Sequence, residues 1–397
     1  MNGLRVTMMP LRHALLLVGL VLLSACASRA PLRDNAPGSR PVSGSDEAEL
    51  WYAMERAEKE LQRSPLLVRD PALNAYVRDV ACKAAAAHCK DLRVYIMDVP
   101  EFNASMAPNG VMLVWTGALL RMRDEAELAF VLGHETGHFT AQHSIRQWRR
   151  IKDTTAFLSV FQLLAYGGGA PNIAMLGGLA GYATIFKFSR DMEREADTIG
   201  VASLVRDGYD PRAGVSLWAR MLAEEKARPY QKRMKLFSTH PPSEERLADI
   251  GDAAKAAGDA PRDLGRDRYR TAMRPYLERW LVNDLAQRRY ASSILLIEGL
   301  LADAPAADRG LLTFSLGEVY RRRAGAGDRA RAATYYAQAI TMPEAPPAAW
   351  REHGYALRDA GQPAAARSAL QRYLDQAPKA EDRALVEREL QKTGGGR

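Results

Sequence analysis

The sequence predicts an α+β fold that is mostly helical, with a small sheet in its first half and only helices in its second half. Two strand-like runs, Leu92–Met97 and Val111–Trp115, lie among helical patterns. Past Asp263 the composition becomes rich in Ala, Arg and Tyr, with helical periodicity and no strand signal. A chain of 397 residues with 47% apolar residues can bury a sizeable core and suggests two or three domains.

Residues 1–25 have the pattern of a secretion signal. Arg5 and Arg12 precede the apolar run Ala14–Leu23, which is too short to span a bilayer. The run ends in Leu23-Ser24-Ala25-Cys26, which resembles the lipobox of bacterial lipoproteins. The resemblance implies cleavage before Cys26 and acylation of that residue. Because no Asp follows Cys26 directly, it also implies a periplasmic protein anchored to the inner leaflet of the outer membrane. An ordinary secretion signal with an incidental Cys is the alternative.

Residues 26–46 are rich in Pro, Ser, Gly and Arg without periodicity, so we expect a flexible tether after the lipid anchor. The net charge of the whole chain is +8, and loss of the two signal arginines leaves it near +6. Most basic residues are scattered, and no basic surface interleaved with aromatic residues is apparent. We therefore expect no nucleic-acid binding.

The first helices of the body are predicted at Glu47–Gln62 and Asp70–Ala87. Cys82 and Cys89 lie at the end of the second helix. In an oxidising compartment two cysteines at this spacing favour a disulfide over a metal site, with free thiols as the alternative. A bridge between them requires the last helical turn to unwind before Cys89.

The two strand-like runs are separated by a turn at Ala107-Pro108-Asn109-Gly110. The second run immediately precedes the helix that carries the main motif of the chain. Because proteases commonly bind substrate as an added strand, we expect Val111–Thr116 to be the exposed edge of the sheet.

The main motif is the stretch Phe130–Thr140, in which His134, Glu135 and His138 spell H-E-x-x-H. Asp124-Glu125-Ala126-Glu127 resembles a capped helix start, which places the motif on a helix running to about Arg150. Residues four apart project from one helix face, so both imidazoles can bind one Zn²⁺. Glu135 lies beside them and can take a proton from water bound to that ion.

A third ligand is expected after a long uncharged stretch, in the segment from Ser189 to Asp197. Glu193 and Asp197 are four residues apart, so one could bind the metal while the other accepts the second N–H of a ligand His. Glu195 is the rival ligand on spacing alone. His143 lies five residues past His138, about 140° around a continuous helix. We therefore expect His143 to be a surface or packing residue.

The motif His134-Glu135-x-x-His138 and the segment Ser189-Arg190-x-x-Glu193-x-Glu-Ala-Asp197, preceded by Asn103–Gly110, resemble the zinc peptidases that include HtpX and the CAAX prenyl proteases. The resemblance implies a gluzincin-like metallopeptidase domain, here residues 47–262, with one Zn²⁺ per chain. It implies the ligands His134, His138 and Glu193, the general base Glu135, and Asp197 as support for a ligand His.

Within this family the chain is most similar to a soluble periplasmic branch whose members carry a C-terminal tetratricopeptide (TPR) domain. That likeness implies quality control of outer-membrane proteins. The partners it implies are unfolded or misassembled outer-membrane proteins and the β-barrel assembly machinery. A protease and a chaperone or scaffold with latent proteolysis are the two functional hypotheses.

Two further segments bear on the site. Thr154–Phe186 carries no charge and is interrupted by glycines, so we expect buried or cleft-lining helices, with a lid touching membrane or unfolded substrate as the alternative. His240 precedes Pro241 and Pro242 and so lies on a stiff loop. In the resembling branch, a His in such a loop is a fourth, inhibitory zinc ligand. The alternatives for His240 are stabilisation of an oxyanion and simple packing.

The second half, residues 263–397, is predicted to be an all-α domain. Gly361-Gln362-Pro363 between two helices, with Trp350 and Pro378 around it, resembles one TPR unit, although the spacing departs from a strict repeat. Stacked helix pairs bind extended peptides or partner proteins, so we expect a binding role, with a structural cap as the alternative. The expected helices are 267–288, 290–303, 308–324, 328–341, 347–360, 363–376 and 381–392.

Overall fold

A computed structural model of the chain describes residues 36–43, 45–152, 188–228, 240, 244–258 and 262–394. The predicted signal sequence, Cys26, most of the predicted tether and the uncharged stretch 154–186 lie outside these residues. Among the helices of the described ranges, none is both long enough and apolar enough to cross a membrane.

The fold is α+β and mostly helical, as predicted, and its sheet has three strands. They are β1 (Arg93–Met97), β2 (Ala104–Met106) and β3 (Val111–Trp115), in the order β1-β3-β2. β3 pairs with β1 in parallel and with β2 in antiparallel orientation. The expectation that Val111–Thr116 forms the sheet edge is therefore wrong, because β3 is the central strand. β2 has only three residues, too few to produce a readable alternation of apolar and polar residues.

The turn between β2 and β3 lies where the sequence predicts it. Gly110 has φ +88°, and a Cβ at this position would lie 2.0 Å from the carbonyl oxygen of Asp91. The carbonyl of Gly110 in turn accepts a hydrogen bond from the amide of Arg93 at 2.9 Å. A glycine is required here, because any side chain would push the hairpin away from β1.

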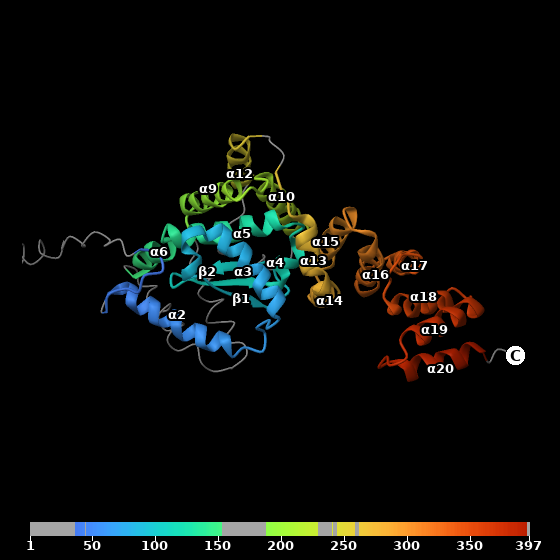
Figure 1. Cartoon of the computed structure of the whole chain (residues 1–397). Coiled ribbons are helices and arrows are strands. Elements are labelled where there is room, and N and C mark those ends of the chain that lie inside the picture. The colour runs from blue at the N-terminus through green and yellow to red at the C-terminus, as the bar shows by residue number, and fades with distance from the viewer. Residues whose placement is uncertain are drawn as a thin grey trace, which may run out of the picture.

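Both faces of the sheet are buried, which explains why β3 is apolar throughout. On one face Met97, Leu113 and Trp115 pack with Leu50 and Met54 of α2 (Asp46–Gln62). On the other face, residues of all three strands join the core formed with α3 (Pro71–Ala85) and α5 (Glu125–Thr140). Figure 1 shows the sheet between α2 on one side and α3 and α5 on the other.

The helix that carries the H-E-x-x-H motif begins at a side-chain cap and ends at a break in the helical repeat. Asp124 caps its N-terminus by accepting a hydrogen bond from the amide of Glu127 at 2.9 Å. The helix was predicted to continue to about Arg150, but it ends at Thr140. Gln142 has φ +54°, and α6 (His143–Lys152) then begins in a new direction. A left-handed residue breaks the helical repeat here.

Three helices cover α5 from the other side: α9 (Arg190–Arg206), α10 (Arg212–Lys226) and α12 (Glu244–Ala256). α9 packs along α5, and α10 and α12 pack against the α5–α9 pair (Figure 1). Short elements join the larger ones: the 3-10 helix η1 (Ala86–Asp91) precedes β1, and α4 (Thr116–Arg121) follows β3.

The second half consists of helices at nearly the predicted positions. The predicted helix 267–288 is interrupted at Arg274-Pro275-Tyr276 by the 3-10 helix η2, because Pro275 lacks an amide hydrogen. The helices are α13 (Arg266–Met273), α14 (Leu277–Ala286), α15 (Tyr290–Ala302), α16 (Ala306–Arg323), α17 (Asp328–Ala339), α18 (Pro347–Asp359), α19 (Pro363–Gln376) and α20 (Arg383–Gly394).

The apolar core continues without interruption across residue 262. Tyr269, Trp280 and Leu316 belong to the same buried cluster as Leu119 and Phe130. Helices α13 to α16 therefore pack onto the sheet-containing body, and α17 to α20 extend beyond it (Figure 1). Because the two halves share one core, no separation of cores marks a boundary between residues 262 and 263. The predicted domain boundary at this point stays a prediction.

A buried ion network joins the same two halves. Arg121 of α4 donates to Glu224 of α10 at 3.0 Å and to Asp284 of α14 at 2.7 Å, and all three side chains are almost fully buried. Ser292 and Ser293 donate to the same two carboxylates. Removing one partner from such a network leaves a buried charge uncompensated, which costs about 3–5 kcal/mol.

Helices α16 and α17 form one antiparallel pair and α18 and α19 another. In the first pair Gly317 lies against the ring of Tyr336, and in the second pair Gly354 lies against Leu370. A small residue of one helix thus faces a large residue of the next in both pairs. This recurrence supports the description of the region as TPR-like.

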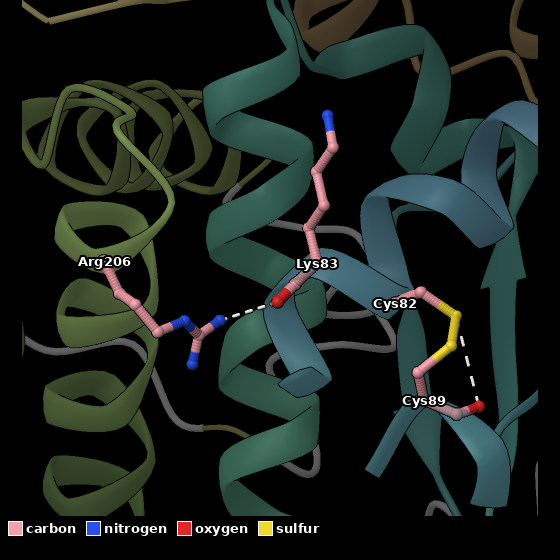
Figure 2. Close-up of a disulfide and its surroundings, with 4 residues drawn as sticks. All are labelled: Cys82, Lys83, Cys89 and Arg206. Atoms are coloured by element: carbon pink, nitrogen blue, oxygen red, sulfur yellow. Dashed lines mark hydrogen bonds between the residues drawn. A yellow bond between two sulfur atoms is a disulfide. The ribbon is translucent and has the colours of Figure 1, made fainter. Parts of the chain in front are cut away.

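Cys82 and Cys89 are joined by a disulfide, and α3 ends at Ala85 so that the chain can turn between them. Ala86 has φ +49° and starts η1. Arg206, at the end of α9, donates to the carbonyl of Lys83 at 2.6 Å (Figure 2). It also donates to the carbonyl of Ala84 at 2.9 Å. The disulfide therefore closes the turn that also anchors the end of α9.

We expect replacement of both Cys82 and Cys89 by Ser to lower the free energy of unfolding by about 2 kcal/mol, because the unfolded chain loses a closed loop. Urea denaturation followed by circular dichroism measures the change. The matched control is the wild-type chain denatured after reduction, which should unfold at the same urea concentration as the double variant. An unchanged denaturation midpoint in the double variant would contradict the prediction.

Candidate metal centre

The candidate site lies where α5 and α9 approach each other most closely. Gly133 and Gly137 immediately precede the two histidines of the motif and face Gly200 and Ala196 on α9. A Cβ on Gly133 would lie 2.3 Å from the hydroxyl of Ser203, and one on Gly137 would lie 3.0 Å from the Cα of Ala196. The absence of side chains lets the two helices pack backbone to backbone, which brings Glu193 across to the histidines.

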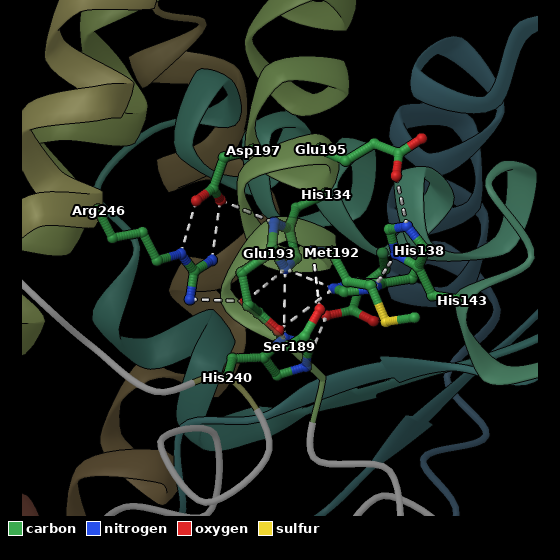
Figure 3. A network of polar contacts seen from close by, with 11 residues as sticks. His134, His138, His143, Ser189, Met192, Glu193, Glu195, Asp197, His240 and Arg246 are labelled. Carbon is green, nitrogen blue, oxygen red and sulfur yellow. Dashed lines mark hydrogen bonds and ion pairs between the residues drawn. The ribbon is translucent and has the colours of Figure 1, made fainter. Parts of the chain in front are cut away.

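Four side chains converge on one buried point: His134 and His138 from α5, Glu193 from α9, and His240 (Figure 3). One ligand atom from each lies within 4.8 Å of all the others. The Nε2 atoms of His134 and His138 are 3.0 Å apart, and Nδ1 of His240 lies 3.3 Å from Nε2 of His134. The structure thus assembles residues that are far apart in the chain.

The residues around this point fit a metal ion. Imidazole nitrogens and a carboxylate oxygen are donors that Zn²⁺ accepts, and catalytic zinc sites commonly use three of them, such as two His and one Glu. Nδ1 of His134 lies 2.8 Å from Oδ1 of Asp197, so the carboxylate holds the proton on Nδ1 and leaves the lone pair of Nε2 facing the cluster. Burial, assisted by the charges of neighbouring groups, lowers the pKa of His138 well below its ordinary value, which keeps this imidazole neutral and able to bind a metal.

Arg246 of α12 fixes both carboxylates of α9. Its guanidinium donates to Asp197 through two nitrogens, at 2.6 and 2.8 Å, and a third nitrogen lies 2.8 Å from Oε2 of Glu193. Burial raises the pKa of Asp197, but the charge and hydrogen bonds of Arg246 outweigh it and lower the pKa to about 2. Arg246 therefore keeps Asp197 ionised and leaves Oε1 of Glu193 directed toward the histidines. The sequence analysis did not assign Arg246 to the site.

Glu135 is only 2% exposed and lies next to the cluster. Burial raises the pKa of Glu135 above its ordinary value. A carboxylate that is desolvated in this way is a stronger base than one in water, as a proton acceptor in catalysis needs to be.

His240 lies between Glu135 and the other members of the cluster. Its Nδ1 is 3.0 Å from Oε1 of Glu193, and its Nε2 is 3.6 Å from Oε1 of Glu135. Burial lowers the pKa of His240, but the charges of Glu193 and Glu135 outweigh it and raise the pKa above the ordinary value. The imidazole thus lies close to both carboxylates.

His143 is a packing residue outside the cluster of candidate ligands, which is one of the two roles expected, but it does not point away from His138. His143 is fully buried, and its Nδ1 lies 2.8 Å from Nδ1 of His138. The prediction assumed one continuous helix, whereas the break at Gln142 turns His143 back beneath His138. Glu195, the rival ligand, points to Nε2 of His143 at 3.0 Å and lies outside the cluster.

Phe188 is a further neighbour of the site that the sequence analysis missed. Its ring stacks on His138 with 4.0 Å between the ring centres. Phe188 directly precedes Ser189, whose hydroxyl accepts from the amide of Met192 and caps α9. A large apolar residue before the cap was the signal in the sequence.

A buried H-E-x-x-H helix that faces a carboxylate from a second helix defines a metallopeptidase domain. Residues 68–254 match Peptidase family M48, so this part of the chain is a metallopeptidase domain similar to that family.

Several proteins of known description are similar to part of the chain. A putative beta-barrel assembly-enhancing protease of Vibrio cholerae is 30% identical over 249 residues, which cover 59% of this chain and 50% of the relative. The beta-barrel assembly-enhancing protease of Escherichia coli K12 is 31% identical over 49% of this chain and 42% of its own length. The mitochondrial metalloendopeptidase OMA1 of Schizosaccharomyces pombe is 33% identical over 42% of this chain and 48% of its own length. The chain thus spans about half the length of each of these relatives.

We expect His134→Ala to abolish binding of the metal ion, because the variant removes one of the converging lone pairs. The purified chain is expected to hold one zinc ion and the variant much less than one, measured by inductively coupled plasma mass spectrometry. Glu135→Gln is the matched control, since it lies one residue away and should keep the ion. Undiminished zinc in His134→Ala would contradict the candidate site.

Proposed function

We propose that the chain is a zinc-dependent endopeptidase with one Zn²⁺ held by His134, His138 and Glu193. The observation that carries the proposal is the convergence of these three side chains, from two helices packed at backbone distance, beside a buried carboxylate. When bound, the ion would polarise a water molecule and the carbonyl of the scissile peptide bond.

The residues of the chain divide the remaining work. Glu135 accepts the proton of the attacking water and then delivers it to the nitrogen of the departing amine. Asp197 holds the Nδ1 proton of His134, and Arg246 holds Asp197 and Glu193 in place. β2 has one strand neighbour and packs near α5, so an extended substrate would add along β2 in place of the edge first expected at β3.

We infer further that His240 keeps the enzyme latent as a fourth ligand. Two contacts support this role: Nδ1 belongs to the donor cluster, and Nε2 lies beside Glu135. In this position the imidazole excludes the water on which Glu135 acts. An imidazole that instead stabilised an oxyanion would have to stand free of the metal.

The role of inhibitory fourth ligand and the role of oxyanion stabiliser predict opposite changes in proteolysis for His240→Ala. If the closed form accounts for about nine molecules in ten, removal of the imidazole raises proteolysis of an unfolded protein about tenfold. Glu135→Gln should lower proteolysis by about 10²-fold or more. The double variant is the control, because it should be inactive if the added activity arises at this site. Reduced activity of His240→Ala would favour the oxyanion role, and unchanged activity would favour packing.

We propose that the protein works in the periplasm, attached through lipidated Cys26 to the inner leaflet of the outer membrane. The lipobox-like sequence Leu23–Cys26 supports the anchor, and the similarity to bacterial proteases that enhance β-barrel assembly supports the compartment. Its substrates would be unfolded or misassembled outer-membrane proteins. The TPR-like helices would bind these substrates or the β-barrel assembly machinery.

The alternative is a chaperone or scaffold in which proteolysis is normally off. The extended helices α17 to α20 and the position of His240 favour this hypothesis. The intact set of candidate ligands and the buried base Glu135 favour the protease. The two functions are compatible if the closed site opens only on demand.

A complementation experiment distinguishes the protease hypothesis from the chaperone or scaffold hypothesis. In a bacterium whose own copy of this gene is deleted, we expect Glu135→Gln to fail to restore resistance of the envelope to large antibiotics, because proteolysis is lost. The wild-type gene, expressed to the same level by immunoblot, is the control. Full rescue by Glu135→Gln would mean that the helices alone perform the physiological task.

A further inference from the structure

His138 is held by a chain of side chains that the proposed mechanism does not use. Its Nδ1 lies 2.8 Å from Nδ1 of His143, and Nε2 of His143 lies 3.0 Å from Oε2 of Glu195 (Figure 3). Arg146 lies 3.3 Å from the same carboxylate oxygen. His143 is fully buried, whereas the side chain of Glu195 is half exposed.

The directions of these hydrogen bonds follow from the carboxylate at the outer end. An ionised carboxylate only accepts hydrogen bonds, so Nε2 of His143 must carry a proton and donate it to Glu195. Nδ1 of a neutral His143 then has a lone pair and accepts. The proton between the two rings must consequently lie on Nδ1 of His138.

The position of that proton decides what His138 offers to the cluster. With Nδ1 protonated, Nε2 of the neutral ring carries a lone pair, and this lone pair points at Nε2 of His134, 3.0 Å away. Asp197 produces the same orientation in His134. Two lone pairs that face each other at this distance repel, and a cation between them removes the repulsion.

We propose that His143 and Glu195 are positioning residues that lock His138 in its metal-binding tautomer. The inference rests on the proposed metal site and adds a second carboxylate that orients a ligand. Asp197 contacts His134 directly, whereas Glu195 acts on His138 through the imidazole of His143. Partners of this kind typically contribute 10- to 100-fold to metal affinity.

The break at Gln142 makes this support possible. On a continuous helix, His143 would point about 140° away from His138. The left-handed Gln142 ends α5, and α6 starts with His143 beneath the ring. His143, five residues after the last His of the H-E-x-x-H motif, can therefore contact His138 only because the helix breaks between them.

The test measures the zinc dissociation constant of the full chain by competition with a chromogenic chelator. We expect Glu195→Ala to weaken zinc binding about tenfold and His143→Leu about 10- to 100-fold. His143→Asn should be intermediate, because its amide oxygen can still accept from Nδ1 of His138. Asp191→Ala, on the same helix and exposed, and Arg146→Gln, which keeps the bond between Glu195 and His143, are the matched controls and should bind like the wild type.

A second readout is independent of the metal. Long-range ¹H–¹⁵N spectra of the metal-free, ¹⁵N-histidine-labelled chain should show His138 protonated on Nδ1 in the wild type and as a mixture of tautomers in Glu195→Ala. Glu195 is half exposed, so this variant leaves the core intact even if His143→Leu folds poorly.

The outcomes distinguish the two proposals. Failure of the wild type to bind zinc overturns the proposed metal site itself. Tight zinc binding by the wild type together with equal affinity in Glu195→Ala and His143→Leu overturns only the role of the His143–Glu195 pair. A metal-free wild type protonated on Nε2 of His138 overturns it as well.

Discussion

The close packing of α5 on α9 is the constraint on which the rest of the site depends. Gly133 and Gly137 leave room for Ala196 and Gly200, so the two helices meet without intervening side chains. Because a carboxylate side chain is short, Glu193 reaches the histidines only at this separation. A methyl group at either glycine would move α9 outward and carry Glu193 and Asp197 away from the cluster. The glycines of the H-E-x-x-H segment are thus as much a part of the site as the histidines.

Close packing also buries several charges, and the structure satisfies them in pairs. Arg246 binds Asp197 and Glu193, and its guanidinium lies over the ring of Trp218 at 4.6 Å. A buried ion pair is favourable only when its remaining hydrogen-bonding groups also find partners. Here each carboxylate has a second task toward the imidazoles, so the arrangement that compensates the charges also sets the orientation of the ligands.

The site is connected to the helical half through the body and not through a loose linker. Arg246 and His240 lie six residues apart, so the residue that fixes the carboxylates and the residue that fills the site belong to one segment. α12 packs on α10, whose Glu224 takes part in the buried network with Arg121 and Asp284. The helices beyond residue 262 and the domain that holds the site therefore share one core.

The sequence alone predicted most of the helices, two of the three strands and the two candidate histidine ligands, because these depend on local spacing, while the choice of Glu193 over Glu195 followed from the family resemblance. A separation of four residues, slightly more than one helical turn, places His134 and His138 on one face, and Glu193 and Asp197 have the same separation. The uninterrupted apolar run of β3 was also readable, but not its central place in the sheet, since the short partner β2 leaves no periodic signal.

Only the tertiary structure decided which distant side chains meet. The break at Gln142 turned His143 toward His138, against the direction predicted, because a single left-handed residue changes the direction of every side chain that follows it. The contacts of Arg246 and of His240 join elements some fifty to a hundred residues apart in the chain. Such contacts depend on how helices pack, and packing is set by the whole core and not by any local pattern.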